Sequence, residues 1–163
     1  MEIRPAVAAD ASAINQIYDH YVRRSHATFD LEPRSVAWRA EWLAEHADLR
    51  HRVIVASVDD AALGYASSSR YRARPAYDTT VETSVYVHHG RVGRGVGAAL
   101  YAALFDALAH AELHRAVAGI ALPNPASLAL HDRFGFRRVG VFTEQGHKFG
   151  RYWNVAWYER SLG

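Results

Sequence analysis

The chain of 163 residues contains no cysteine. It therefore cannot form a disulfide bond, a thiolate metal site or a cysteine nucleophile, and the absence of thiols fits a cytoplasmic protein. Its apolar runs fall short of the roughly 18 residues of a membrane-spanning helix. The segment Met1–Pro5 does not have a signal-peptide pattern, so we expect no association with a membrane.

A strong excess of charge of one sign is also missing. The formal net charge is +2 at pH 7, which is too weak to indicate nucleic-acid binding by itself. The ten histidines are scattered and form no H-E-x-x-H or Cys/His cluster. We therefore expect most of them at the surface, and we expect no metal site and no nucleic-acid partner.

What is present is an alternation of strand and helix patterns. Apolar residues at helical spacing predict four helices, at 11–23, after Ser35, from the glycine-rich loop to 111, and at 124–134. Alternating and β-branched runs predict strands at 2–7, 52–58, 63–72, 80–87, 116–122, 138–143 and 152–160. This order predicts a single α/β domain over residues 1–163, with a mixed sheet.

The junction Val85–Tyr101 carries the strongest local signal. Three glycines alternate there, at positions 93, 95 and 97, and they are interspersed with Arg91 and Arg94. The start of a helix offers unpaired N–H groups and a partial positive charge, and glycines let a ligand approach them closely. The pattern predicts a pyrophosphate-binding loop, although a turn that only joins a strand to a helix also fits. It is neither a Walker loop nor a G-x-G-x-x-G fingerprint.

Two motifs resemble the GNAT N-acetyltransferases. Gly95-Val96-Gly97 fits the second half of their acyl-CoA loop, Gln/Arg-x-x-Gly-x-Gly/Ala, although the Gln/Arg position falls on Val92. Further along, Asn124, Ser127 and Gly135-Phe136 fit a second family pattern, in which His131 replaces a tyrosine. The order and separation of the two motifs also agree with the family.

The resemblance implies a fold and a cofactor. The fold is α/β (α+β), with a mixed, mostly antiparallel sheet of about seven strands, flanked by four helices and splayed where acetyl-CoA binds. No metal is implied. The implied acetyl-CoA-binding residues are Val85, Tyr86, Val87, Gly93, Arg94, Gly95, Val96, Gly97, Ala98, Asn124 and Ser127.

The stretch Arg72–Val87 is similar to the phosphinothricin and methionine sulfoximine (sulfone) acetyltransferases within that family. The ending His147-Lys148-Phe149-Gly150-Arg151-Tyr152-Trp153 is similar as well. This branch implies a homodimer and acetyl transfer to the α-amine of a small amino-acid-like acceptor. The implied acceptor-binding residues are Arg72, Arg74, Tyr77, Glu82, Thr83 and Ser84.

Two residues are candidates for proton transfer. Glu82 lies in mid-strand and is placed to take the proton of the amine, although an edge or salt-bridging glutamate is the alternative. His131 is placed to protonate the leaving thiolate, although a half-exposed helix residue, with water as the acid, is the alternative. Arg70, Arg72 and Arg74 alternate, so an extended backbone would put them on one side; a solvated basic edge also fits.

Two other functions remain open from the sequence. A non-catalytic acyl-CoA-binding module would keep the glycine loop but need not keep both Glu82 and His131. An enzyme that acetylates protein N-termini, another amine or tRNA needs an open groove matched in charge to a polymer. Arg72, Arg74 and the Ala-Tyr-Asp stretch favour a small anionic acceptor.

Overall fold

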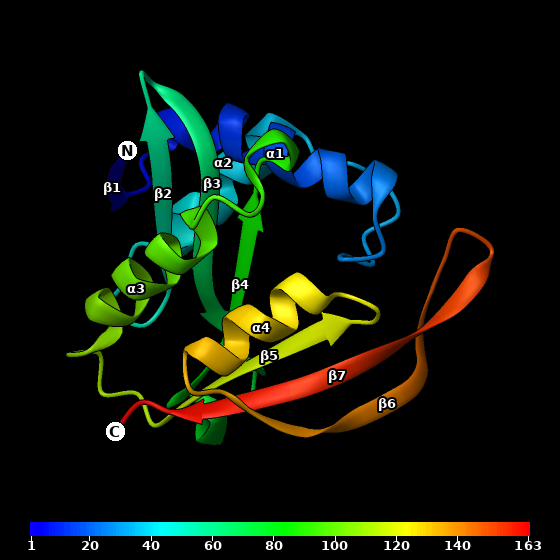
Figure 1. Ribbon diagram of the computed structural model, residues 1–163. Coiled ribbons are helices and arrows are strands. Elements are labelled where there is room, and N and C mark those ends of the chain that lie inside the picture. Colours follow the sequence, from blue (N-terminus) through cyan, green and yellow to red (C-terminus); the bar gives the residue numbers. More distant parts are fainter.

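A seven-stranded sheet forms the centre of the protein, and four helices lie against its faces (Figure 1). The computed structural model describes all residues, 1–163. The strands are β1 (Glu2–Pro5), β2 (Arg52–Val58), β3 (Ala61–Arg70), β4 (Thr80–Val87), β5 (Arg115–Ala121), β6 (Arg137–Lys148) and β7 (Arg151–Ser161). The helices are α1 (Ala11–Arg24), α2 (Val36–Glu45), α3 (Val96–Leu108) and α4 (Pro125–Arg133).

Side-chain alternation along the strands explains how the helices are divided between the two faces. Successive residues of a strand point to opposite faces. Val53 and Tyr65 pack with α1 and α2 in one cluster, whereas Ile54 and Ala66 pack with α3 in the other. Three leucines of α3, at 100, 104 and 108, are buried on that second face, as their spacing predicts. Burial of each contributes about 1.5–3 kcal/mol.

The sheet separates between β4 and β5. The order of the strands is β1-β2-β3-β4-β5-β7-β6, and β4 with β5 is the parallel pair. This pair is joined only over Thr80–Glu82, opposite Arg115–Val117. Beyond Glu82 the two strands diverge, and α4 lies along the separated β5 (Figure 1). The predicted fold, including its splayed sheet, is therefore confirmed.

Two predicted strand ends are wrong. β3 ends at Arg70, and the chain bends before the 3-10 turn Pro75–Tyr77, so the three alternating arginines do not follow one extended strand. β6 extends to Lys148 rather than to 143, because a tight turn at Phe149 and Gly150, both with positive φ, returns the chain into β7.

None of the helices combines the length and the apolar character that crossing a bilayer requires.

Candidate active site

The separation of β4 and β5 leaves a cleft of about 640 Å³. Its walls come from both strands, from the start of α3, from α4 and from the loop that follows α1. The cleft therefore forms where β4 and β5 stop pairing. The start of α3, α4 and the loop after α1 close around it. The lining residues include Thr83–Val87, Gly95–Ala98, Ala118–Ala121, Pro123–Ser127 and Ser25–Ala27.

The glycine loop presents free backbone donors at one end of the cleft. Gly93 and Gly95 have φ values of +78° and +80°, a region that strongly favours glycine. Gly95 caps α3 without a side-chain bond, and the Ala99 N–H makes the first helical bond, to the Gly95 carbonyl. The N–H groups of 96–98 therefore lack helical acceptors, an arrangement that suits an anion because the helix dipole adds partial positive charge.

The backbone of β4 also faces the gap. The Tyr21 hydroxyl donates to the Val87 carbonyl, so the peptide groups of Val87 point away from β3. In an antiparallel pair, alternate residues direct their peptide groups to the same edge. Val85, two residues earlier, therefore also offers its N–H to the cleft.

Glu82 lies where the sheet divides. It pairs with Val117 at the last paired position of the two strands. Its side chain lies on the same face as that of Tyr86, which packs on Tyr18 and Tyr21 of α1. Glu82 makes no ion pair, and burial raises the pKa of its carboxyl above the ordinary value. A buried carboxylate without a cation favours taking up a proton.

His131 is buried on the opposite face, between α4 and α3. Its Nδ1 lies 2.8 Å from the Ser127 carbonyl, which can only accept, so Nδ1 carries the hydrogen. In the neutral ring, Nε2 then accepts from the Tyr101 hydroxyl at 2.9 Å. Burial lowers the pKa of His131, although the bond to Ser127 opposes this shift. The ring is therefore mainly neutral at pH 7 and is held at both nitrogens.

Tyr101 is a cleft residue that the sequence did not reveal. It is fully buried, and its hydroxyl lies 3.4 Å from Thr83 Oγ1 as well as beside His131. It follows Leu100 in an apolar helix, so its local pattern indicates only core packing. Only the contact between α3 and α4 shows that it joins the predicted proton donor.

Asn124 begins α4 and leaves part of its amide free. Its Oδ1 accepts from the Ser127 N–H at 3.2 Å, which caps the helix. The Nδ2 group remains available as a donor at the cleft wall. Asn124 therefore both fixes the helix start and offers a hydrogen bond to a ligand.

The predicted acceptor arginines lie outside the cleft. Arg72 is exposed and stacks on Tyr71 and Tyr77, with its guanidinium carbon 5.0 and 5.5 Å from the ring centres. Arg74 is exposed as well, and Arg70 pairs with Asp78 at 3.1 Å instead. The bend after β3 separates these side chains from the cleft lining.

The structure brings most of the predicted residues together, but not all of them. Those at the cleft are Thr83, Ser84, Val85, Tyr86, Val87, Gly93, Gly95, Val96, Gly97, Ala98, Asn124, Ser127 and His131. Glu82, Arg72, Arg74, Tyr77 and Arg94 do not line it. The wall formed by Ser25–Ala27 was not predicted, because a polar loop carries no periodic signal.

Comparison with known proteins agrees with this geometry. The acetyltransferase (GNAT) domain family matches residues 3–157. A phosphinothricin N-acetyltransferase of Streptomyces coelicolor is 54% identical, over 99% of this chain and 96% of its own. An L-methionine sulfoximine/L-methionine sulfone acetyltransferase of Salmonella typhimurium is 34% identical, over 99% of this chain and 95% of its own.

A solved structure extends the comparison to three dimensions. The phosphinothricin acetyltransferase of Sinorhizobium meliloti, crystallised with acetyl-CoA, superimposes with a TM-score of 0.94 at 34% sequence identity. The superposition covers 99% of this chain and 88% of that one. The similarity thus extends over nearly the whole chain, including the segments that line the cleft.

Proposed function

Because the chain belongs to the GNAT acetyltransferase family, it is an acetyl-CoA-dependent N-acetyltransferase, and we propose which acceptor and residues it uses. The acceptor is the α-amine of a small amino-acid-like molecule of the phosphinothricin, methionine sulfoximine or methionine sulfone type. The observation that carries this proposal is the cleft itself. One end of it has the free backbone N–H groups of the glycine loop, and the half-buried carboxyl of Glu82, which has no ion-pair partner, lies beside it where the strands divide.

The residues of the cleft fit acetyl-CoA. Gly93 and Gly95 have open space where a side chain would stand, and the N–H groups of 96–98 are free to hold a pyrophosphate. Val85 and Val87 offer an open strand edge, and Asn124 offers its amide to the pantetheine arm. Acetyl-CoA supplies an acetyl group activated as a thioester. We propose that Tyr86, Arg94 and Ser127 make further contacts with acetyl-CoA.

Glu82 is the proposed base. Its raised pKa and its position at the division of the sheet suit a group that takes a proton from the attacking amine, directly or through water. Thr83 and Ser84 adjoin it on β4 and line the cleft. The N–H of Val85 is placed to stabilise charge that develops on the thioester carbonyl oxygen.

The proposed acid is His131, acting with Tyr101. The relay starts from the protonated form of His131, the minor form at pH 7, in which Nε2 donates to the Tyr101 oxygen. The Nε2 proton passes to that oxygen while the tyrosine hydroxyl gives its own proton to the thiolate. After both proton transfers, His131 is a neutral imidazole, Tyr101 again carries its hydroxyl proton, and the thiolate has become a free thiol. The 2.9 Å bond between the two side chains supports this route.

For the acceptor's anionic group we propose Arg72, Arg74 and Tyr77. Arg72 and Arg74 are exposed and Tyr77 is half-buried, and all three are close together in the chain, beyond the end of β3. Arginine forks match carboxylate, phosphinate and sulfone oxygens. The amine of the proposed acceptor then lies near Glu82, and its anionic group lies toward Arg72, Arg74 and Tyr77.

A free-thiol assay with acetyl-CoA tests the proposal. The panel contains phosphinothricin, methionine sulfoximine, methionine sulfone, unmodified amino acids and a peptide with a free N-terminus. We expect release of thiol with the phosphinic and oxidised sulfur compounds, and little with the peptide. Turnover with the peptide alone would contradict the small-molecule acceptor. Acetyl-CoA binding without any turnover would indicate a non-catalytic module.

We also propose that the protein is a homodimer joined through β6. This strand forms one edge of the sheet, and it exposes Val139 and Phe142 by 58% and 57%. An exposed apolar edge strand is a favourable surface for pairing with a second copy. Two tryptophans of β7 pack within the chain and are therefore not proposed as interface residues. Trp153 stacks on His26, and Trp157 covers Gly119.

A further inference from the structure

Lys148 is the only lysine in the chain, whereas the other 18 basic residues are arginines. It ends β6, beside the turn to β7, and its side chain is 3% exposed. A buried ammonium needs compensation for every hydrogen. The rest of the chain uses arginine in place of lysine. A lysine here therefore indicates that the position requires the three N–H donors of a compact ammonium group rather than a planar guanidinium.

The ammonium group has three acceptors in one segment. Nζ donates to the carbonyls of Ser25 and Thr28 at 2.7 Å each, and to that of Tyr21 at 3.3 Å. Tyr21 and Ser25 lie at the C-terminal end of α1, which carries a partial negative charge, and the Tyr21 carbonyl also accepts the capping N–H of Ser25. Lys148 thus joins the β6–β7 turn to the loop after α1.

Other contacts fix the same loop to the same hairpin. The rings of His26 and Trp153 stack, with centres 4.1 Å apart and planes within 2°. Phe29 packs on Gly146, where a Cβ atom would lie 2.3 Å from the ring. The loop is therefore held at three points by a hairpin far away in the sequence.

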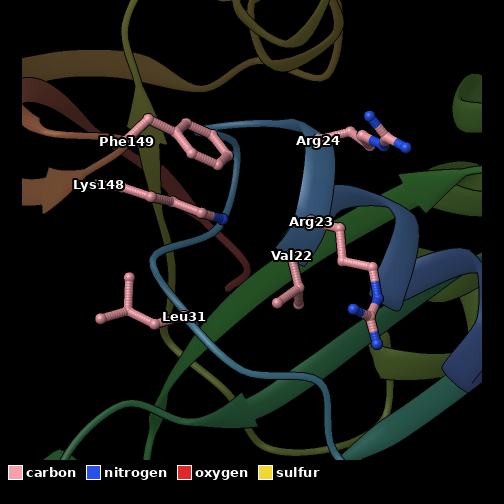
Figure 2. A pocket seen from close by; sticks show the side chains of 6 residues that line it. All are labelled: Val22, Arg23, Arg24, Leu31, Lys148 and Phe149. Atoms are coloured by element: carbon pink, nitrogen blue, oxygen red, sulfur yellow. The ribbon is translucent and has the colours of Figure 1, made fainter.

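The small cavity beside Lys148 is not an anion site. It has a volume of about 400 Å³, and Figure 2 shows Arg23 and Arg24 directed away from Lys148 and Phe149. The three hydrogens of Nζ are already used by the carbonyls. Lys148 therefore serves the loop rather than a ligand in that cavity.

The loop held by Lys148 forms a wall of the cleft on the side of Glu82. Ser25, His26 and Ala27 line the cleft, and the loop continues α1. The side chain of Glu82 points to the face that α1 covers, whereas α3 covers the other face. An amine that reaches Glu82 must therefore approach from the face that this loop encloses.

We propose that Lys148 is a positioning residue for the acceptor, which fixes the loop 25–30 and so sets the acceptor side of the cleft. The expected effect of Lys148 on the acceptor KM rests on the proposed function. The loop itself is defined by contacts that exist without any substrate.

The variant Lys148→Met tests the inference. We expect the acceptor KM to rise by about 10-fold or more, because a small displacement of a substrate wall is costly, while the KM for acetyl-CoA stays unchanged. Lys148→Arg keeps the charge but not the geometry, and we expect an intermediate rise. Arg138→Met, an exposed change on the same strand, is the control with no expected effect. An unchanged acceptor KM in Lys148→Met would overturn the inference.

A second variant decides the matter if Lys148→Met does not fold. Trp153→Leu removes the stack on His26 and leaves the ammonium in place, so we expect a smaller rise in the acceptor KM. An amine-reactive reagent should modify Lys148 slowly in the wild type and faster in Trp153→Leu. Equal rates, with an unchanged KM, would contradict the inference.

Amide exchange separates this inference from the proposed function. We expect the amides of 25–30 to exchange faster in both variants, while those of α3 stay protected. If the wild type acetylates no acceptor, the proposed function fails, and the exchange still decides whether Lys148 holds the loop. Unchanged exchange there would overturn its positioning role.

Discussion

The half-buried Glu82 and the buried His131 and Lys148 occupy different electrostatic environments. Glu82 has no cation, His131 is bonded at both ring nitrogens, and Lys148 donates to three carbonyls. Burial disfavours the charged form of each group, but the ammonium group of Lys148 is compensated by three carbonyls, which can only accept hydrogen bonds. Its charge is therefore retained for structure, whereas Glu82 and His131 are available for proton transfer.

Glu82→Gln should abolish the acidic limb of the pH profile. Because burial raises the pKa of Glu82, its carboxyl is protonated and inactive as a base below that pKa, so kcat/KM of the wild type falls as pH falls through it. Glutamine accepts no proton, and we expect kcat/KM to fall by about 100-fold or more, as expected for the loss of a general base. Steady-state kinetics across pH measure both effects.

The stability of this variant distinguishes chemistry from folding. Removal of a half-buried carboxyl without an ion-pair partner should not lower Tm, since an acidic group whose pKa is raised on folding disfavours the folded state near neutral pH. Glu41→Gln, on the exposed face of α2, is the control for a lost carboxylate. A Glu82→Gln protein with wild-type kcat/KM would show that water alone takes the proton.

Tyr101→Phe and His131→Phe should lower kcat by similar factors. If the proton reaches the thiolate through both side chains, loss of either breaks the route, and about 10²-fold is typical for a general acid. The double variant should be no slower than the slower single variant, because members of one route are not additive. A Tyr101→Phe enzyme with normal kcat would exclude the relay.

At the scale of single elements, the start of α3 shows how local geometry makes a binding site. Gly95 adopts a left-handed conformation and caps the helix with its backbone alone. A polar cap residue would satisfy one of the N–H groups that the proposal gives to the pyrophosphate. The absence of a side-chain cap therefore leaves these N–H groups free for the proposed ligand.

Gly95→Ala should weaken acetyl-CoA binding selectively. The left-handed conformation costs a residue with a Cβ atom about 1–2 kcal/mol, so the loop should shift away from its present geometry. We expect the KM for acetyl-CoA to rise by about 10-fold, which corresponds to ~1.4 kcal/mol, with no change in the acceptor KM. Gly140→Ala, at an open position without positive φ, is the matched control. Equal effects on both KM values would refute a dedicated pyrophosphate loop.

At the scale of the whole molecule, one edge of the sheet remains available for assembly. β1 forms the opposite edge with only four residues, whereas β6 has twelve and carries the exposed apolar pair Val139 and Phe142. A long, unpaired edge strand that exposes apolar side chains is a favourable surface for pairing with another chain. This asymmetry places the proposed interface at β6.

Phe142→Glu should convert a dimer into a monomer. A charge at the centre of the proposed interface would lose its hydration on pairing, which is costly without a partner cation. Sedimentation equilibrium should give twice the mass of one chain for the wild type and a single mass for the variant. Leu49→Glu, equally exposed on the loop before β2, should leave the mass unchanged. A monomeric wild type would contradict the proposal.

The sequence by itself determined the features that depend on neighbours in the chain. The spacing of leucines predicted α3, the Ser35 cap predicted the start of α2, and alternating glycines predicted the open loop at 93–97. Backbone conformation, capping and amphipathic spacing act within a few residues, so a linear pattern expresses them. The order of strands and helices followed from the same patterns and from the family resemblance.

Only the tertiary structure decided which distant residues meet. The division of the sheet at Glu82, the bond between Tyr101 and His131, and the attachment of Lys148 to the loop after α1 all join separate elements. The bend after β3 likewise took Arg72 and Arg74 out of the extended line that their alternation had predicted. Such contacts depend on how whole elements pack, and packing is a property of the complete fold that no local pattern contains.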